Sequence, residues 1–195
     1  MGFWNTWKAV MFEPMKFFEK MPKKVSISDA SKYYLKIHAI LLGVLAVVGL
    51  FLVAVFSTIF GFFGIEGLAV GGAFFGIYAL VILIGFPVLL LLSWAFMFVS
   101  AGVLHVFAMV FGSKEKYTES VKIVSYSTTP NLLAFIPFIN YIVGVYSIVL
   151  QVMGTHKRHK LSIGKSVAVV LIPFGIYWAL AMMIYIPLII FSSFA

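Results

Sequence analysis

Long apolar runs without charged residues dominate the pattern of the chain. The first, Ile37 to Phe63, has 27 residues, and a helix of that length at about 1.5 Å per residue is ample for a hydrocarbon layer of about 30 Å. The second, Gly67 to Gly112, has 46 residues without a formal charge, too many for one simple span. A last run of 24 residues extends from Val167 to Ile190. These runs predict membrane-spanning helices.

The stretch from Ile123 to Gly154 is interrupted by prolines. Pro130 and Pro137 free backbone carbonyls, which need protein or water partners inside a bilayer. We predict a turn near 137–140, with an arm of about fifteen residues on each side, which is short for a full span. Two short crossings and a re-entrant hairpin both fit this pattern. Polar side chains here, including Asn131 and Asn140, either satisfy the freed carbonyls or line a polar cavity.

The residues before the first run have an amphipathic pattern. Apolar residues recur every three or four positions with lysines between them, which is typical of a helix lying flat in the headgroup region. Pro14 interrupts the pattern, so we predict two short helices rather than one. Packing of this stripe against the protein's own transmembrane helices is the alternative. The candidate interfacial residues are Phe3, Trp4, Trp7, Phe17 and Phe18.

Composition extends this picture to the whole chain. Of the 195 residues, 63% are apolar and 10% are charged, against about 45–50% and about 25% in soluble domains. A core of this size cannot hide so much apolar side chain, so lipid must cover the rest. An ordinary soluble domain is thereby excluded. The absence of cysteine excludes disulfides, zinc-finger sites and thiol nucleophiles.

The 14 lysines and arginines fall in three clusters, which predict the topology. Basic residues near spans stay on the cytoplasmic side, so an even number of crossings separates consecutive clusters. We therefore expect a single all-α membrane domain over 1–195, with a cytoplasmic amino terminus and an outer carboxyl terminus, in the cell membrane for a prokaryotic protein. Its expected parts are an amphipathic arm at 1–36 and five spans at 37–63, 73–111, 123–137, 140–154 and 167–190.

The two later basic clusters predict contact with membrane lipid. Each Lys or Arg near an anionic surface contributes about 1 kcal/mol, so we expect binding of anionic phospholipid. Orientation in the membrane alone also explains these charges. Protein partners and a homo-oligomer both stay open, and we expect no nucleic-acid partner. The candidate residues are Lys114, Lys116, Lys122, Lys157, Arg158, Lys160 and Lys165.

Four glycines and one histidine are further candidates inside the spans. Gly67, Gly71, Gly72 and Gly76 have four-residue spacings that let helix backbones approach closely, although a flexible or broken helix gives the same pattern. His105 is the only ionisable group expected at membrane depth, which makes it a functional candidate. A neutral, hydrogen-bonded imidazole near the inner interface is the alternative.

The sequence predicts no catalytic, cofactor or metal site. No two carboxylates fall inside a span, which argues against intramembrane aspartyl chemistry and ion-coupling pairs. His156 and His159 are three residues apart, but no Cys or carboxylate joins them and the adjacent cations repel a metal. No phosphate-binding loop or nucleophile elbow occurs. We therefore expect a protein that is not an enzyme and carries no cofactor.

Four short motifs follow one another along the chain: Trp7…Glu13-Pro14…Phe17-Phe18; Gly102-Val-Leu-His105 with Phe111-Gly112-Ser113; Tyr126-Ser127-Thr-Thr-Pro130; and Gly154…His159-Lys-Leu-Ser162…Lys165-Ser166. In this order they resemble the Yip family, membrane proteins named for interaction with Ypt and Rab GTPases, in its short prokaryotic form. The resemblance implies one multi-pass domain with a cytosolic amino terminus. Eukaryotic members act in vesicle transport between endoplasmic reticulum and Golgi. Their long acidic arm and Asp-Leu-Tyr-Gly-Pro sequence do not occur here, and the resemblance supplies no established activity for prokaryotic members.

Two classes of function fit these patterns. The first is a membrane organiser or adaptor, whose cytosolic loops and amphipathic arm bind lipid and partner proteins. The second is a small-solute carrier or lipid-translocating protein, which would use the interrupted third and fourth spans as a polar passage. The lack of carboxylates inside the spans favours the organiser.

Overall fold

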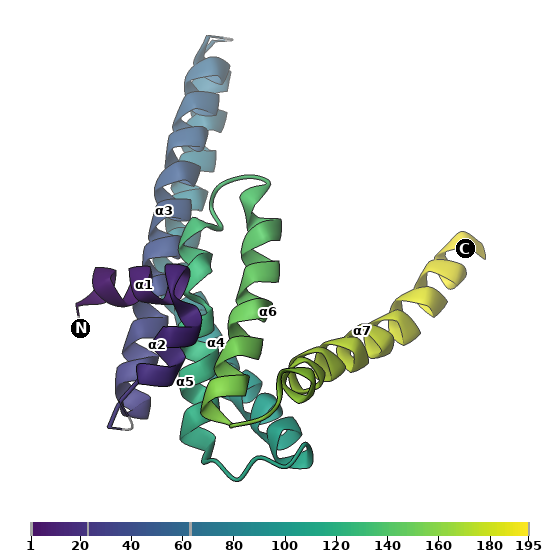
Figure 1. Ribbon diagram of the computed structural model, residues 1–195. Helices are drawn as coiled ribbons and strands as arrows, with labels where there is room; N and C mark the ends of the chain where they lie inside the picture. The colour runs from purple at the N-terminus through teal and green to yellow at the C-terminus, as the bar shows by residue number, and fades with distance from the viewer. Residues whose placement is uncertain (1, 23, 63, 195) are drawn as a thin grey trace.

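The computed structural model describes residues 2–22, 24–62 and 64–194, with the side chains at 60, 65–68, 184 and 188–194 left out of the description. The chain is 86% helix, and no strand occurs among the described residues, so the expected all-α class is confirmed (Figure 1). The elements are α1 (Phe3–Phe12), α2 (Pro14–Lys20), α3 (Ile27–Gly61), α4 (Ile65–Val110), α5 (Tyr117–Ser127), the short 3-10 helix η1 (Thr129–Leu133), α6 (Ile139–Arg158) and α7 (Ile163–Phe194).

Three helices in the described part of the chain are long and apolar enough to cross a membrane. They are the segments Ile27–Ile59, Ala69–Val110 and Ile163–Pro187 of α3, α4 and α7. In Figure 1, α3 and α4 form a long hairpin, and α7 leaves the other helices at an angle. The spans expected at 37–63, 73–111 and 167–190 fall largely within these three helices.

Helix α3 begins at Ile27, well before the apolar run, because Ser26 and Asp29 cap its first turn. The Asp29 amide donates to Ser26 Oγ at 3.1 Å, and the Ser26 amide donates to Asp29 Oδ2 at 3.1 Å. This reciprocal pair satisfies two backbone donors at the start of the helix. The polar first turns of α3 therefore continue directly into the span and carry Lys32 and Lys36 on the same helix.

The segment from α5 to α6 folds as a short hairpin beside α3 and α4. Helix α5 has 11 residues and α6 has 20, and the irregular stretch 134–138 between η1 and α6 lies where the prolines predicted a turn. Figure 1 shows that this hairpin ends well short of the tip of the α3–α4 hairpin. Neither helix is among the three candidate spans, so the five-span count and the spans at 123–137 and 140–154 stay predictions.

Helix α5 lies at the centre of the packing. Its Val121 and Ile123 are fully buried against Met97 and Leu104 of α4 and Val169 of α7. A second apolar cluster joins the amino-terminal arm to α3, η1 and α6 through Val10, Phe18, Met21, Ile37, Tyr126, Leu132 and Leu150. A helix with several serines is thus enclosed on all sides by the protein.

The predicted close approach of glycines is present at only one of the described positions. A Cβ placed on Gly71 would lie 2.8 Å from the Cα of Ser57 in α3, and the Ser57 hydroxyl donates to the Gly71 carbonyl at 2.9 Å. At Gly72 and Gly76 no close approach occurs, because a Cβ there would meet nothing within 4 Å. Gly67 lies outside the described residues for such contacts.

A glycine that the spacing argument missed gives the first testable prediction. A Cβ at Gly154 in α6 would lie 2.9 Å from Ile123 Cγ2 and 3.2 Å from Phe18 Cε1. Gly154→Val should therefore lower the free energy of unfolding by about 1–3 kcal/mol, measured by thermal unfolding in detergent. Gly144→Ala on the same helix is the matched control, because nothing lies within 4 Å there, and it should not destabilise the protein. Equal stability of Gly154→Val and the wild type would contradict this packing.

Candidate functional site

The second and third basic clusters meet the end of the arm at one end of the molecule, which we call the basic end. It comprises residues 18–22 at the end of the arm, the connection and helix start at 111–122, and residues 157–165 at the junction of α6 and α7. Figure 1 shows the α4–α5 connection, the end of α6 and the start of α7 at this same end. Ion pairs join the clusters to one another, as the following contacts show. Basic residues of the second and third clusters, which are separated in sequence, thus form one region in space.

A single carboxylate lies at the centre of the basic end. Arg158 Nε donates to Glu119 Oε2 at 2.6 Å, and Lys122 Nζ donates to Glu119 Oε1 at 2.9 Å. Arg158 also donates through Nη1 to the Met21 carbonyl at 3.0 Å. The lysine side chain is 1% exposed and the glutamate side chain 13% exposed. Glu119 and Arg158 together therefore join α5, α6 and the end of the arm inside a largely desolvated cluster.

Further contacts surround this cluster at the surface. Lys157 pairs with Glu19 of α2 at 2.9 Å, and Lys160 pairs with Glu115 at 2.6 Å. The hydrogen bond from Lys157 lowers the pKa of the Glu19 carboxyl below its usual value. Exposed pairs of this kind contribute at most about 1 kcal/mol each. They fix the relative positions of the arm, the α4–α5 connection and the end of α6 without adding much stability.

The lysines predicted to contact lipid have different environments. Lys122 is buried, so its prediction as a headgroup contact is wrong for this conformation, and its charge instead faces Glu119. Lys157 and Arg158 are only partly exposed and engage carboxylates. The exposed members of the set, which we call the surface lysines, are Lys114, Lys116, Lys160 and Lys165.

A histidine and two serines form a buried network next to Glu119. His159 Nδ1 lies 2.7 Å from Ser113 Oγ, and its Nε2 lies 2.9 Å from Ser120 Oγ. Ser120 Oγ also lies 3.3 Å from Nδ1 of His105, so this candidate residue is a hydrogen-bonded imidazole at the end of α4. His156 does not join His159, because its Nδ1 lies 2.6 Å from the Leu161 carbonyl.

Burial lowers the pKa of His159 to about 4, with a further decrease from the nearby His105 ring and Arg158, and opposing effects of Glu119 and Glu115. The side chain is 2% exposed, so protonation would place a charge among groups that cannot hydrate it. The neutral imidazole is therefore the form that fits this network, donating to one serine and accepting from the other.

The amino-terminal arm consists of two helices, as Pro14 predicted, and Pro14 occupies the first turn of α2. The prediction that Phe18 lies at the lipid interface is wrong, because this side chain is fully buried, as is Val10. Trp7 Nε1 donates to the Thr129 carbonyl at 3.2 Å, and Phe17 packs edge-on against Tyr126. The arm packs largely on the protein's own helices, which was the alternative to an interfacial position.

The outer side of the arm keeps an interfacial character. Trp4 is 59% exposed and Phe12 is 74% exposed, whereas Phe3 is half-buried against Tyr33. Aromatic residues next to lysines are typical of membrane interfaces. Of the predicted interfacial set, Trp4 is therefore the residue whose exposure best suits that role.

The polar residues of the interrupted hairpin form local hydrogen bonds. Tyr33 and Thr129 share a hydrogen bond of 3.0 Å between their hydroxyls, and Thr128 donates to the Ser125 carbonyl at 2.8 Å. Asn131 accepts from Ser147 at 3.4 Å, whereas Asn140 is exposed at the start of α6. The hairpin therefore places Asn131 in a contact with Ser147 of α6, whereas Asn140 stays at the surface and is not brought together with Asn131.

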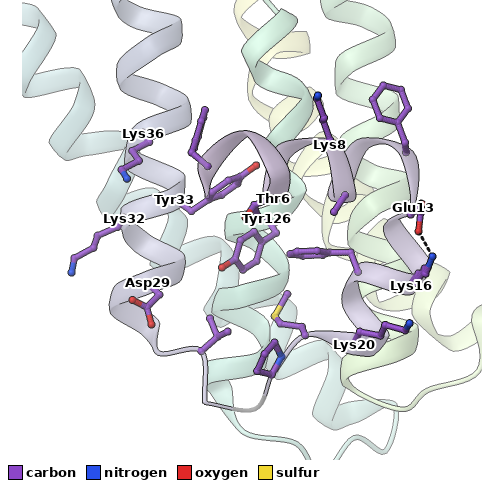
Figure 2. A pocket seen from close by; sticks show the side chains of 17 residues that line it. Thr6, Lys8, Glu13, Lys16, Lys20, Asp29, Lys32, Tyr33, Lys36 and Tyr126 are labelled. Carbon is purple, nitrogen blue, oxygen red and sulfur yellow. Dashed lines mark ion pairs between the residues drawn. The ribbon is translucent and has the colours of Figure 1, made fainter. Parts of the chain in front are cut away.

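The sequence pattern did not predict a groove of about 1090 Å³ between the arm and the start of α3. Figure 2 shows Tyr33 and Tyr126 at its centre, with lysines from both the arm and α3 around them. The sequence did contain one indication of a basic wall: Lys32 and Lys36 are four residues apart in α3 and so lie on one face of the helix. Nothing in the sequence indicated that the arm would lie opposite this face.

The long apolar helices and the exposed apolar surface of α3, α4 and α7 define a multi-pass helical membrane protein. A model of the Yip1 domain matches residues 8–186, and the chain therefore belongs to the Yip family. Comparisons with curated proteins and with solved structures found no significant match.

Removal of the central carboxylate should destabilise the fold. Glu119→Gln deprives two cations of a carboxylate in a desolvated cluster, and breaking a buried pair costs about 3–5 kcal/mol. Glu19→Gln is the matched control, because its pair with Lys157 is exposed and its loss should change the midpoint little. The measurement is the midpoint of thermal unfolding in detergent. Equal midpoints for the two variants would contradict the central role of Glu119.

The His159 network predicts a loss of stability in mild acid. The unfolded chain binds a proton at this histidine below a pKa of about 6.5, but the folded chain binds it only below about 4. The free energy of unfolding should therefore fall as pH decreases from about 6.5 to about 4, by up to roughly 3 kcal/mol. Melting curves at pH 7.5 and 5 measure this change. In His159→Gln the decrease should be smaller, and an unchanged decrease would show that another group is responsible.

Proposed function

We propose that this Yip-family protein is a non-enzymatic membrane organiser or adaptor, whose basic end binds anionic phospholipid and carries the contact surface for partner proteins. The observation that supports this proposal is the grouping of the surface lysines beside the Glu119 cluster at one end of the helices. A fixed array of lysines attracts an anionic bilayer surface without any chemical step. Partner proteins or a second copy of the chain would contact the same end.

We further propose that the basic end faces the cytoplasm of the cell in which the protein is made. The position of the second and third basic clusters at this end supports the orientation, because lysines and arginines near spans remain on the cytoplasmic side. With five spans, the amino terminus would be cytoplasmic and the carboxyl terminus outside. In a prokaryotic cell this membrane would be the cell membrane.

The carrier remains the second candidate, but the hairpin contacts favour the organiser. A polar passage needs side chains that are wetted and free to change partners. Instead, the Thr129 and Thr128 hydroxyls bond to neighbouring groups, and Asn131 is engaged by Ser147. Hydrogen bonds of this kind inside a membrane protein stabilise it by about 0.6 kcal/mol each.

Lipid retention tests the organiser proposal. Changing three surface lysines together, Lys114→Gln, Lys116→Gln and Lys165→Gln, should reduce the phosphatidylglycerol that co-purifies with the protein several-fold, because each lysine contributes about 1 kcal/mol. The matched control changes the same three lysines to Arg and should retain lipid like the wild type. Wild-type retention should also fall in 1 M salt, where screening is strong. Undiminished retention in the Gln variant, or solute flux through wild-type liposomes, would contradict the proposal.

Cysteine labelling tests the orientation, since the natural chain has no cysteine. A Lys116→Cys variant should react with an impermeant maleimide only after cell lysis, because Lys116 is exposed at the basic end. An Asn140→Cys variant reports on the opposite end of the α5–α6 hairpin and should react from outside intact cells if this hairpin crosses the membrane. External reaction at position 116 would contradict the orientation. Failure of position 140 to react from outside would contradict the five-span count.

A further inference from the structure

The groove between the arm and α3 has two walls, which come from different segments of the chain, and an aromatic floor. Helices α1 and α2 supply one wall, and the first turns of α3 supply the other (Figure 2). The floor contains Phe17, Tyr33 and Tyr126, whose rings pack on one another with centroid distances of 5.1 Å for Phe17–Tyr126 and 4.9 Å for Tyr33–Tyr126. The volume of about 1090 Å³ lies just above the usual range for small-molecule sites, about 300–1,000 Å³.

The charge around the groove is strongly positive. Five lysines and two acidic residues line it, and both acids are already engaged. Glu13 pairs with Lys16 at 2.6 Å, and Asp29 accepts hydrogen bonds from Ser26. The other four lining lysines form no ion pair within the described part of the chain; these groove lysines are Lys8, Lys20, Lys32 and Lys36. A ligand that fits this rim carries negative charge.

The position of the groove requires the ligand to carry an apolar part as well. Lys32 and Lys36 lie on α3 just before the uncharged run that begins at Ile37, so the groove lies where the helix passes from polar to apolar surface. Phe12, which also lines the groove, is 74% exposed. A small soluble anion would meet the lysines but leave the aromatic floor uncovered.

We propose that this groove binds one anionic phospholipid, with its phosphate among the groove lysines and its acyl chains against the aromatic floor and the adjacent apolar surface of α3. The site is separate from the surface lysines of the basic end. This second lipid proposal depends on the proposed function in one respect only, because it requires anionic lipid around the protein. The bound lipid would fill the space between the arm and α3 and so hold the arm in place.

Native mass spectrometry of the full-length protein in detergent, titrated with phosphatidylglycerol, tests the proposal. The wild type should bind a first lipid with defined stoichiometry. Lys8→Gln, Lys20→Gln, Lys32→Gln and Lys36→Gln combined should weaken this first binding step at least tenfold. Ala9→Trp should weaken it comparably, because Ala9 lines the groove and a large side chain would fill it at unchanged charge. The first step should not occur with neutral phosphatidylcholine.

Two controls are needed. The first distinguishes binding in the groove from binding at the basic end, and the second distinguishes a lipid ligand from a small soluble anion. The triple Gln variant at positions 114, 116 and 165 should keep the first lipid even where it loses bulk retention, so the two proposals fail independently. Glycerol 3-phosphate, a headgroup without chains, should not displace the lipid. The proposal is overturned if the four-lysine variant binds the first lipid like the wild type, if folded Ala9→Trp does so, or if glycerol 3-phosphate displaces it. If Ala9→Trp does not fold, the four-lysine variant decides alone, because all four of its side chains are exposed.

Discussion

Glu119 and Arg158 together join three parts of the chain that are distant in sequence, and the arrangement of the basic end depends on their ion pair. Two cations, Lys122 and Arg158, share this one carboxylate in a largely desolvated cluster. Desolvated ions are costly unless further groups complete their hydrogen bonds. Arg158 obtains such a bond from the Met21 carbonyl at the end of the arm. The arm is therefore part of the charge cluster and is not simply attached to its surface.

This cluster explains why a short polar helix lies at the centre of a membrane protein. Helix α5 carries Glu119 and Lys122 on its first turns. Between them stands Ser120, which belongs to the histidine network. Its later turns pack among apolar side chains from α4, α6 and α7. The charged groups of the helix lie near the basic end, where the carboxylate, the cations, the histidines and the serines satisfy one another, and its last turn also buries Ser125 and Ser127.

The sequence predicted those features that depend on composition and on the spacing of apolar residues and prolines along the chain. The apolar runs located α3, α4 and α7, and the prolines located the break at Pro14 and the turn before α6. The burial of Phe18 and Lys122 could not be predicted, because a helical period shows which side of a helix is apolar but not what covers it. Lys122 stands in a lysine-rich segment that is typical of a surface, and only the fold places it against Glu119. The groove likewise depends on two segments whose relative position no local pattern contains.

The length of α4 has a consequence for the bilayer itself. Its 46 residues correspond to a helix of about 69 Å, more than twice the thickness of an average hydrocarbon layer of about 30 Å. A hydrophobic helix longer than its membrane tilts, bends or thickens the lipid around it, and each response costs free energy that depends on bilayer thickness. A helix of this length would therefore favour membranes of some thicknesses over others. That preference would sort the protein laterally whether or not any partner is bound.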